Sequence, residues 1–218
     1  MTSVAAGHPL AQANSTLENA VRALRGGGIV ALADVSSRYA QGYVLQLAEL
    51  VTQASVTFMV THARGLVCVA LPEERCDELE LRSLRRGSGD RPTPEYAITV
   101  EARHGVGTGI SSADRAATIR VLGDPDASPD DLVRPGHVVP IRVSARRSAA
   151  GPAAATRLAE LARPRSVAAI CHVLDDGGST IGHVSLCRFA ERHGLPVVTT
   201  AQVLGQPRSA EWSLARAA

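Results

Sequence analysis

Four short apolar runs, separated by segments of helical periodicity, constrain what this chain can fold into more than any other feature. The runs are IVALAD at 29–34, LVCVAL at 66–71, VAAICHVL at 167–174 and PVVTT at 196–200. Short apolar runs bounded by turn residues are typical of buried strands. Strands that alternate with amphipathic helices predict an α/β (α+β) domain, in which helices flank a mixed sheet, rather than an all-helical or all-β fold.

Capping patterns mark where helices begin. Ser15 and Glu18 have the spacing of a capping box, and Ser111 stands three residues before Asp114 in the same way. Together with apolar periodicity, these signals predict helices over 15–25, 52–62, 72–84, 111–122, from about 152 onward and over 183–193, and further strands over 96–102 and 138–145.

The chain has 218 residues, enough for one well-buried core, and it contains nothing that resembles an interdomain linker. We therefore expect a flexible N-terminus over 1–14, one domain over 15–205 and a C-terminal tail over 206–218.

Composition excludes several classes of function. The net charge is only +2 and aromatic residues make up 3%, so neither a nucleic-acid surface nor a base-stacking platform is expected. The chain contains no lysine, which excludes Schiff-base chemistry, pyridoxal phosphate anchoring and a P-loop lysine.

Residues 1–16 lack the charged and apolar regions of a secretory signal, and no apolar run is long enough to span a bilayer. We expect a cytoplasmic protein without a membrane partner. The four cysteines are scattered without a CxxC pair, which in a reducing compartment indicates buried thiols.

Two loop motifs have both a functional and a structural interpretation. The glycine turn GVGTG at 105–109 opens a helix, where free backbone N–H groups can hold a phosphate, but a purely structural turn is the favoured interpretation of this motif alone. His137 lies in RPGH, at the entrance to a strand. A lone histidine is more often structural than catalytic.

A zinc site is a weaker alternative. Cys171 and His172 on a strand, with His183 and Cys187 on the next helix, contain the right ligand types. Their spacing is not a known zinc signature, and one strand would have to turn two successive side chains inward. The structural interpretation is favoured here.

Taken together, the segments resemble 3,4-dihydroxy-2-butanone 4-phosphate synthase, the riboflavin-pathway enzyme that converts ribulose 5-phosphate to a four-carbon ketone and formate. The resemblance runs from the first helix to about Val203. TGISSADRAATIR at 108–120 is close to the family's TGxSAxDRxxT, and LVRPGHVVPIRV at 132–143 to its LNRPGHVFPLR. HARGLVCVAL at 62–71 and AERHGLPVVT at 190–199 resemble two further family blocks.

This sequence departs from the family where the resemblance places the active site. The acidic loop DDEDRENEGD falls on DVSSRYAQGY at 34–43, so the metal-binding glutamate becomes Tyr39 and a second acid becomes Tyr43. The histidine of the family's GHTEA falls on Gly151, and its catalytic glutamate falls on His172. Magnesium requires hard oxygen ligands, so the resemblance predicts a chain that binds no catalytic magnesium and uses no cofactor.

The residues that remain define a candidate site. The candidate catalytic groups are Tyr39, Tyr43, His137 and His172, because phenol and imidazole can move protons. The candidate substrate-binding residues are Arg38, Arg64, Thr108 and Ser111. If the family pocket persists, the catalytic groups and Arg38 should converge on one cavity.

Three functions follow from this sequence. The first is a repurposed, metal-independent cyclase, isomerase or lyase that acts on a small anionic or conjugated metabolite in a specialised biosynthetic pathway. The second is a non-catalytic relative that binds a ligand or pairs with an active subunit. The third and least favoured is a residual synthase acting on ribulose 5-phosphate. A homodimer is expected in each case, because the resembled family is dimeric and two-fold assemblies are the commonest.

Overall fold

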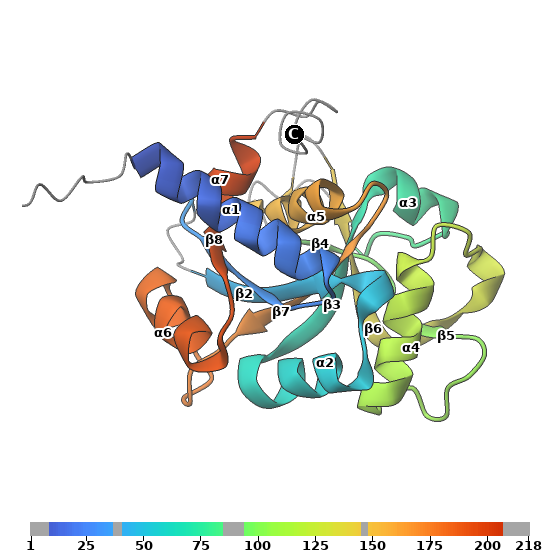
Figure 1. Cartoon of the computed structure of the whole chain (residues 1–218). Coiled ribbons are helices and arrows are strands. Elements are labelled where there is room, and N and C mark those ends of the chain that lie inside the picture. The colour runs from blue at the N-terminus through green and yellow to red at the C-terminus, as the bar shows by residue number, and fades with distance from the viewer. Residues whose placement is uncertain (1–8, 37–40, 85–93, 145–147, 207–218) are drawn as a thin grey trace, which may run out of the picture.

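A central sheet and two layers of helices build the molecule (Figure 1). The computed structural model describes residues 9–36, 41–84, 94–144 and 148–206. The helices are α1 (Pro9–Arg25), α2 (Gln53–Phe58), α3 (Glu73–Glu78), α4 (Ser112–Gly123), α5 (Ala150–Ala162), α6 (His183–His193) and α7 (Thr200–Leu204), with short helical turns η1 (Ala48–Leu50), η2 (Met59–Ala63) and η3 (Pro129–Asp131). The strands are β1 (Val30–Asp34), β2 (Gln41–Leu47), β3 (Arg64–Pro72), β4 (Glu95–Tyr96), β5 (Val100–Ala102), β6 (Leu132–Val143), β7 (Ala168–Val173) and β8 (Val197–Thr199).

The sheet is mixed. Its order is β4-β6-β3-β7-β2-β1-β8, and β5 pairs with β6 beside this path. β3 runs parallel to β6 and β1 runs parallel to β8, whereas β7 is antiparallel to both of its neighbours, β2 and β3. The central strands β1, β2, β3 and β7 are largely buried on both faces, which explains why they read as apolar runs.

Each face of the sheet packs against its own helices (Figure 1). On one face, Val44 and Cys171 belong to a core that includes residues of α2, α4 and α6. On the other face, Tyr43 and Ile170 belong to a core that includes residues of α1 and α5. Because successive strand residues point to opposite faces, the central strands β1, β2, β3 and β7 contribute to both cores.

This architecture confirms the predicted single α/β domain with helices on both sides of a mixed sheet. Local sequence signals also predicted correctly where helices α2 and α4 begin. Thr52 caps α2 with a complete capping box, and the Ser111 side chain accepts a hydrogen bond from the Asp114 N–H at the start of α4.

Other boundaries differ from the sequence-based expectation. The first helix begins at Pro9, ahead of the capping box predicted at Ser15, and α3 ends at Glu78 rather than at Leu84. β2 begins at Gln41, so the last three residues of the segment at 34–43, which the resemblance indicates as a loop, belong to a strand. The strand predicted over 96–102 is split into β4 and β5, and β6 begins before the RPGH motif rather than after it.

The N-terminal segment predicted over 1–14 and the tail predicted over 206–218 lie largely outside the described residues, which begin at Pro9 and end at Gln206. Among the residues that the structure describes, no helix has the length and apolar character that a bilayer crossing requires.

Candidate functional site

Tyr43 and His172 form a contact pair on one face of the sheet. The two residues are direct partners in the antiparallel β2–β7 register. Their ring centroids lie 4.4 Å apart, with an angle of 46° between the ring planes. The pairing therefore brings together two of the candidate catalytic groups, which lie far apart in the sequence.

Glycines make room for this pair. A Cβ at Gly151, in the first turn of α5, would lie 2.6 Å from the Tyr43 ring. A Cβ at Gly65, on β3, would lie 2.3 Å from the His172 carbonyl oxygen. Both distances are below any ordinary carbon contact, so neither position can carry a side chain unless its neighbours move.

Burial keeps both groups of the pair neutral. Tyr43 is 2% exposed, and burial, with the charge of Asp34 as a second cause, raises the pKa of its hydroxyl well above the ordinary value. Burial also lowers the pKa of the His172 imidazole. The Tyr43 hydroxyl donates a hydrogen bond to Gln41 Oε1 on the same strand. The site thus combines a neutral phenol, held by an amide, with a neutral imidazole that can accept a proton.

Asp34, where the resemblance places the first acid of the family loop, has structural partners. It is 6% exposed, and its Oδ1 accepts hydrogen bonds from the Ser36 N–H at 3.0 Å and from the Ser36 hydroxyl at 2.7 Å. The Thr200 hydroxyl adds a third bond at 3.4 Å. These contacts tie the end of β1 to the start of α7.

His137 has a different partner. Its Nδ1 contacts the Glu101 carboxylate on β5, and its side chain is 44% exposed while that of Glu101 is 17% exposed. A carboxylate on Nδ1 fixes the tautomer and leaves Nε2 toward solvent. His137 lies two residues before Val139, which pairs with Cys68 and packs against the same core as Tyr43. His137 and the Tyr43–His172 pair therefore share a face of the sheet but stand on strands that are not neighbours.

The glycine turn at 105–109 is closed by its own helix. The Gly107 and Gly109 N–H groups donate to the Asp114 carboxylate, at 3.2 and 3.1 Å. These bonds, with those from Ser111, hold the pKa of Asp114 below its ordinary value. Because a carboxylate occupies the amides that a phosphate would need, the favoured structural interpretation of this turn fits the geometry. Thr108 and Ser111 are both exposed at this turn, apart from the Tyr43–His172 pair.

Arg64 lies at the start of β3 and pairs with Val173 across to β7, one residue beyond His172. Its guanidinium forms an ion pair with Asp176 at 2.5 Å. Arg38 and Tyr39 lie outside the described residues, so convergence of all five predicted groups stays a prediction.

The described residues do not fit the magnesium site that the resemblance implies. Across 9–36, 41–84, 94–144 and 148–206, no three His, Cys, Asp or Glu side chains come close enough together to hold a metal ion. The resemblance places the metal-binding carboxylate on Tyr39, which lies outside the described residues, and the histidine on Gly151, against which the Tyr43 ring is packed. The arrangement of these residues does not support the zinc alternative. Cys171 belongs to the core on one face of the sheet, whereas the next residue, His172, contacts Tyr43 on the other face.

Sequence reasoning missed two residues of these contacts, Gln41 and Glu101. Gln41 stands two residues before Tyr43 on a strand, a spacing that places both on one face. This spacing is visible in the sequence, but it indicates a shared face only if 41–47 is recognised as a strand. Glu101 gave no signal, because its partner His137 is distant in the chain and is reached only through the pairing of β5 with β6.

Comparison with known proteins extends these observations. A sequence profile of 3,4-dihydroxy-2-butanone 4-phosphate synthase matches residues 18–205. The riboflavin biosynthesis protein RibBA of Salinispora tropica is 40% identical over 199 residues, which cover 90% of this chain and 50% of that protein. RibBA of Aquifex aeolicus is 34% identical over 87% of this chain and 48% of its own length. The chain thus spans about half the length of the curated relatives it matches.

Solved structures agree with this relationship. A crystal structure of RibBX, a two-domain synthase from A. baumannii, superposes with a TM-score of 0.80 at 34% identity, covering 86% of this chain and 56% of that one. A synthase structure in complex with two magnesium ions has a TM-score of 0.80 at 32% identity and covers 87% of this chain and 94% of that one.

These relatives overturn the function that the sequence favoured. We expected a repurposed, metal-independent enzyme of a specialised pathway, but the relatives, at 34–40% identity over most of the chain, are named for riboflavin biosynthesis. That expectation was wrong because it gave a few replaced side chains at the expected active site more weight than the match along the rest of the chain. With a profile match over 18–205 and two structural neighbours at a TM-score of 0.80, the chain belongs to the 3,4-dihydroxy-2-butanone 4-phosphate synthase family.

Proposed function

We propose that this chain serves riboflavin biosynthesis at the 3,4-dihydroxy-2-butanone 4-phosphate synthase step, with ribulose 5-phosphate as its substrate. The observation that carries the proposal is 40% identity to a riboflavin biosynthesis protein over 90% of the chain. The shared fold supports it, because a synthase structure superposes on 87% of this chain with a TM-score of 0.80.

The chemistry open to this chain's own residues is proton transfer. Formation of an enediol from a ketose requires a base that removes a proton from the carbon beside the carbonyl group. His172 suits this role, since burial keeps its imidazole neutral and ready to accept a proton at neutral pH. The Tyr43 ring packs against the imidazole and holds it in place, while the Tyr43 hydroxyl donates its hydrogen bond to Gln41 Oε1. Arg38 is the proposed contact for the substrate anion. We route no step through a metal ion, because the described residues do not offer a ligand set.

We also propose that two copies of the chain assemble. His137 is exposed beside Glu101, on a strand that does not neighbour the Tyr43–His172 pair. A two-fold dimer would allow such an exposed imidazole to serve the site of the other copy. Light scattering at micromolar concentration should give the mass of a dimer, and the mass of a monomer would refute the assembly.

The direct test is formate release. The full chain is incubated with ribulose 5-phosphate, with and without added magnesium, and formate and the four-carbon ketone phosphate are measured. We expect both products in equal amounts. Absence of both products under each condition would refute the proposal.

Variants then test the assigned residues. His172→Gln should lower turnover by about 100-fold or more, the usual effect of losing an acid–base group. His183→Gln is the matched control, because His183 is an exposed histidine at the first turn of α6, outside the proposed machinery, and should leave turnover unchanged. Equal turnover in both variants would remove His172 from the mechanism while leaving the overall reaction intact.

A further inference from the structure

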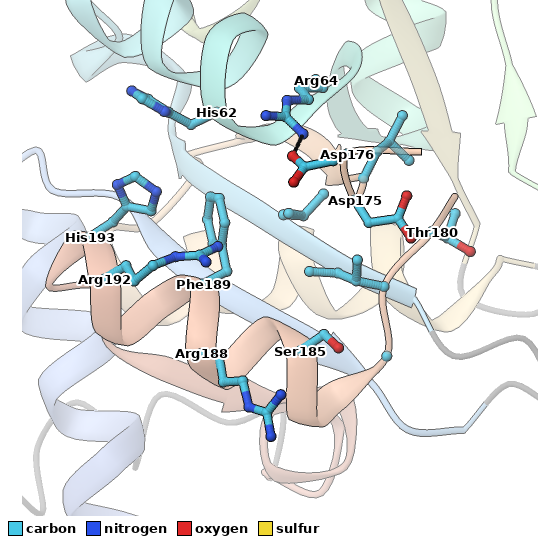
Figure 2. Close-up of a pocket in the computed structure, with 14 residues that line it drawn as sticks. His62, Arg64, Asp175, Asp176, Thr180, Ser185, Arg188, Phe189, Arg192 and His193 are labelled. Carbon is cyan, nitrogen blue, oxygen red and sulfur yellow. Dashed lines mark hydrogen bonds and ion pairs between the residues drawn. The ribbon is translucent and has the colours of Figure 1, made fainter. Parts of the chain in front are cut away.

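A pocket lies on the face of the sheet opposite to Tyr43 and His172. Its volume is about 570 Å³, and it is bounded by η2, the start of β3, the segment after β7 and helix α6 (Figure 2). Val173 and Phe189 line it and belong to the core on the α2, α4 and α6 side, whereas Tyr43 belongs to the opposite core. The pocket is therefore separate from the site proposed above.

Three rings that line this pocket, those of His62, Phe189 and His193, are in contact with one another and with Phe58 behind them. His62 and His193 have centroids 4.8 Å apart, and Phe189 lies 4.6 Å from His193. Phe58 contacts both imidazoles, at 5.0 and 5.1 Å. Burial, with His62 and Arg192 as further causes, lowers the pKa of His193. The rings form a fixed wall that carries two imidazoles as hydrogen-bonding groups.

Positive charge exceeds negative charge around the pocket. Three arginines and two aspartates line it, and Arg64 alone has a contact ion pair, with Asp176. The Asp175 carboxylate accepts hydrogen bonds from turn amides at 3.0 and 2.8 Å. Among the described residues, Arg188 and Arg192 form neither a hydrogen bond nor an ion pair.

A simple structural explanation accounts for part of this pattern. Arg192 is in the last turn of α6, where a cation is stabilised by the helix dipole. Arg188, one turn earlier, gains less from the dipole and repels Arg192 at i, i+4 spacing. The helix dipole also has no bearing on Arg64, which belongs to β3 and holds a left-handed backbone with φ of 69°. This backbone conformation has a structural cause, because Arg64 is the C-cap of the helical turn η2.

Figure 2 shows how these groups are arranged. Arg192 extends along the pocket toward Phe189, His62 and His193 lie toward the left of the view, and Arg64 lies at the top beside Asp176. Arg188 points outward from the same helix at the rim. Guanidinium groups from two separate elements thus line one cavity together with two imidazoles, an arrangement suited to a multivalent oxyanion.

We propose that this pocket binds the phosphate group of a small phosphorylated metabolite, as a second anion site distinct from the substrate position. Arg64 and Arg192 supply the charge, and His62 and His193 supply further donors. Arg64, which was expected from the sequence to bind the substrate, serves this second site instead in our proposal. Because Asp176 is 97% exposed in its side chain, the anion can replace it as the partner of Arg64 at little cost.

Histidine resonances in NMR spectra test this proposal directly, with inorganic phosphate as the probe. Phosphate is titrated into the full chain against sodium chloride of equal ionic strength, and the imidazole signals are assigned with His62→Gln, His172→Gln and His193→Gln variants. We expect saturable shifts of His62 and His193 with phosphate but not with chloride or acetate. The His172 signal reports separately on the opposite face, so failure of this site and failure of the synthase proposal are distinguishable.

Arginine variants complete the test. Arg64→Gln and Arg192→Gln should each weaken phosphate binding about tenfold or more, the effect of losing one charge-assisted hydrogen bond. Arg22→Gln, an exposed arginine on α1 at the other side of the sheet, is the matched control and should leave the affinity unchanged. An absence of shifts at His62 and His193, or equal affinity in the Arg192→Gln and Arg22→Gln variants, would overturn the proposal.

Discussion

Replacing Gly151 by alanine should destabilise the protein, although alanine is ordinarily the better helix former. Gly151 is buried in the first turn of α5, where alanine would by itself add up to about 1 kcal/mol of stability. The new methyl group would, however, lie 2.6 Å from the Tyr43 ring, against 3.4 Å for the closest ordinary contact. Two ring carbons and the hydroxyl oxygen of Tyr43 lie within 2.8 Å, so a slight shift in one direction cannot relieve the overlap.

The ring has little freedom to move away. Tyr43 is 2% exposed, contacts His172 at 4.4 Å between centroids and is hydrogen-bonded to Gln41. Overpacking of a core by one methyl group typically costs about 1–3 kcal/mol. We therefore expect Gly151→Ala to lower the free energy of unfolding by about 2 kcal/mol, with an unchanged dependence on urea concentration.

Urea denaturation followed by circular dichroism measures this loss, and two further variants isolate its cause. In a Tyr43→Leu background, the Gly151→Ala change should become neutral or stabilising, because the ring atoms are gone. Gly177→Ala is a matched control, since its new methyl would meet nothing closer than 3.4 Å and should change stability by less than about 0.5 kcal/mol. An equal effect of Gly151→Ala in both backgrounds would refute the packing argument.

Three further outcomes follow from the titrating groups. Burial lowers the pKa of His172 below 6.5, so protonation of this imidazole is less favourable in the folded protein than in the unfolded chain. The free energy of unfolding is therefore highest above pH 6.5 and falls as the pH drops toward the folded pKa. His172→Gln should therefore reduce the loss of stability between pH 7.5 and 5, measured by urea midpoints. Hydrogen bonds, the one from Gly107 first, hold the pKa of Asp114 below 3.8, so its contribution is present above that pH and is lost as the pH falls through the lower folded value. Asp114→Asn should flatten the acid limb of the stability curve, and an unchanged limb would contradict this assignment. Burial raises the pKa of Cys171 to about 12, so iodoacetamide at pH 8 should modify the half-buried Cys187 first, as seen by peptide mass spectrometry.

The fold class and the family were accessible from the sequence because their signals are local. The runs at 29–34, 66–71 and 167–174 are buried on both faces, so they are apolar without interruption and easy to recognise. Capping residues such as Thr52 and Ser111 act on amides three positions away, within one turn of the chain. Motifs that lie together in the sequence, such as RPGH, are likewise visible before any folding is considered.

The site depended on tertiary structure because its contacts join distant segments. Tyr43 meets His172 only through the register of β2 against β7, and a shift of that register by one residue would turn each side chain to the other face. Glu101 meets His137 only because β5 pairs with β6, and Arg64 meets the residues of α6 only where β3 begins. Side-chain types identify which groups can move a proton or bind an anion, but strand pairing and helix packing decide which of them share a cavity, since distances between remote segments are set by the folded chain as a whole.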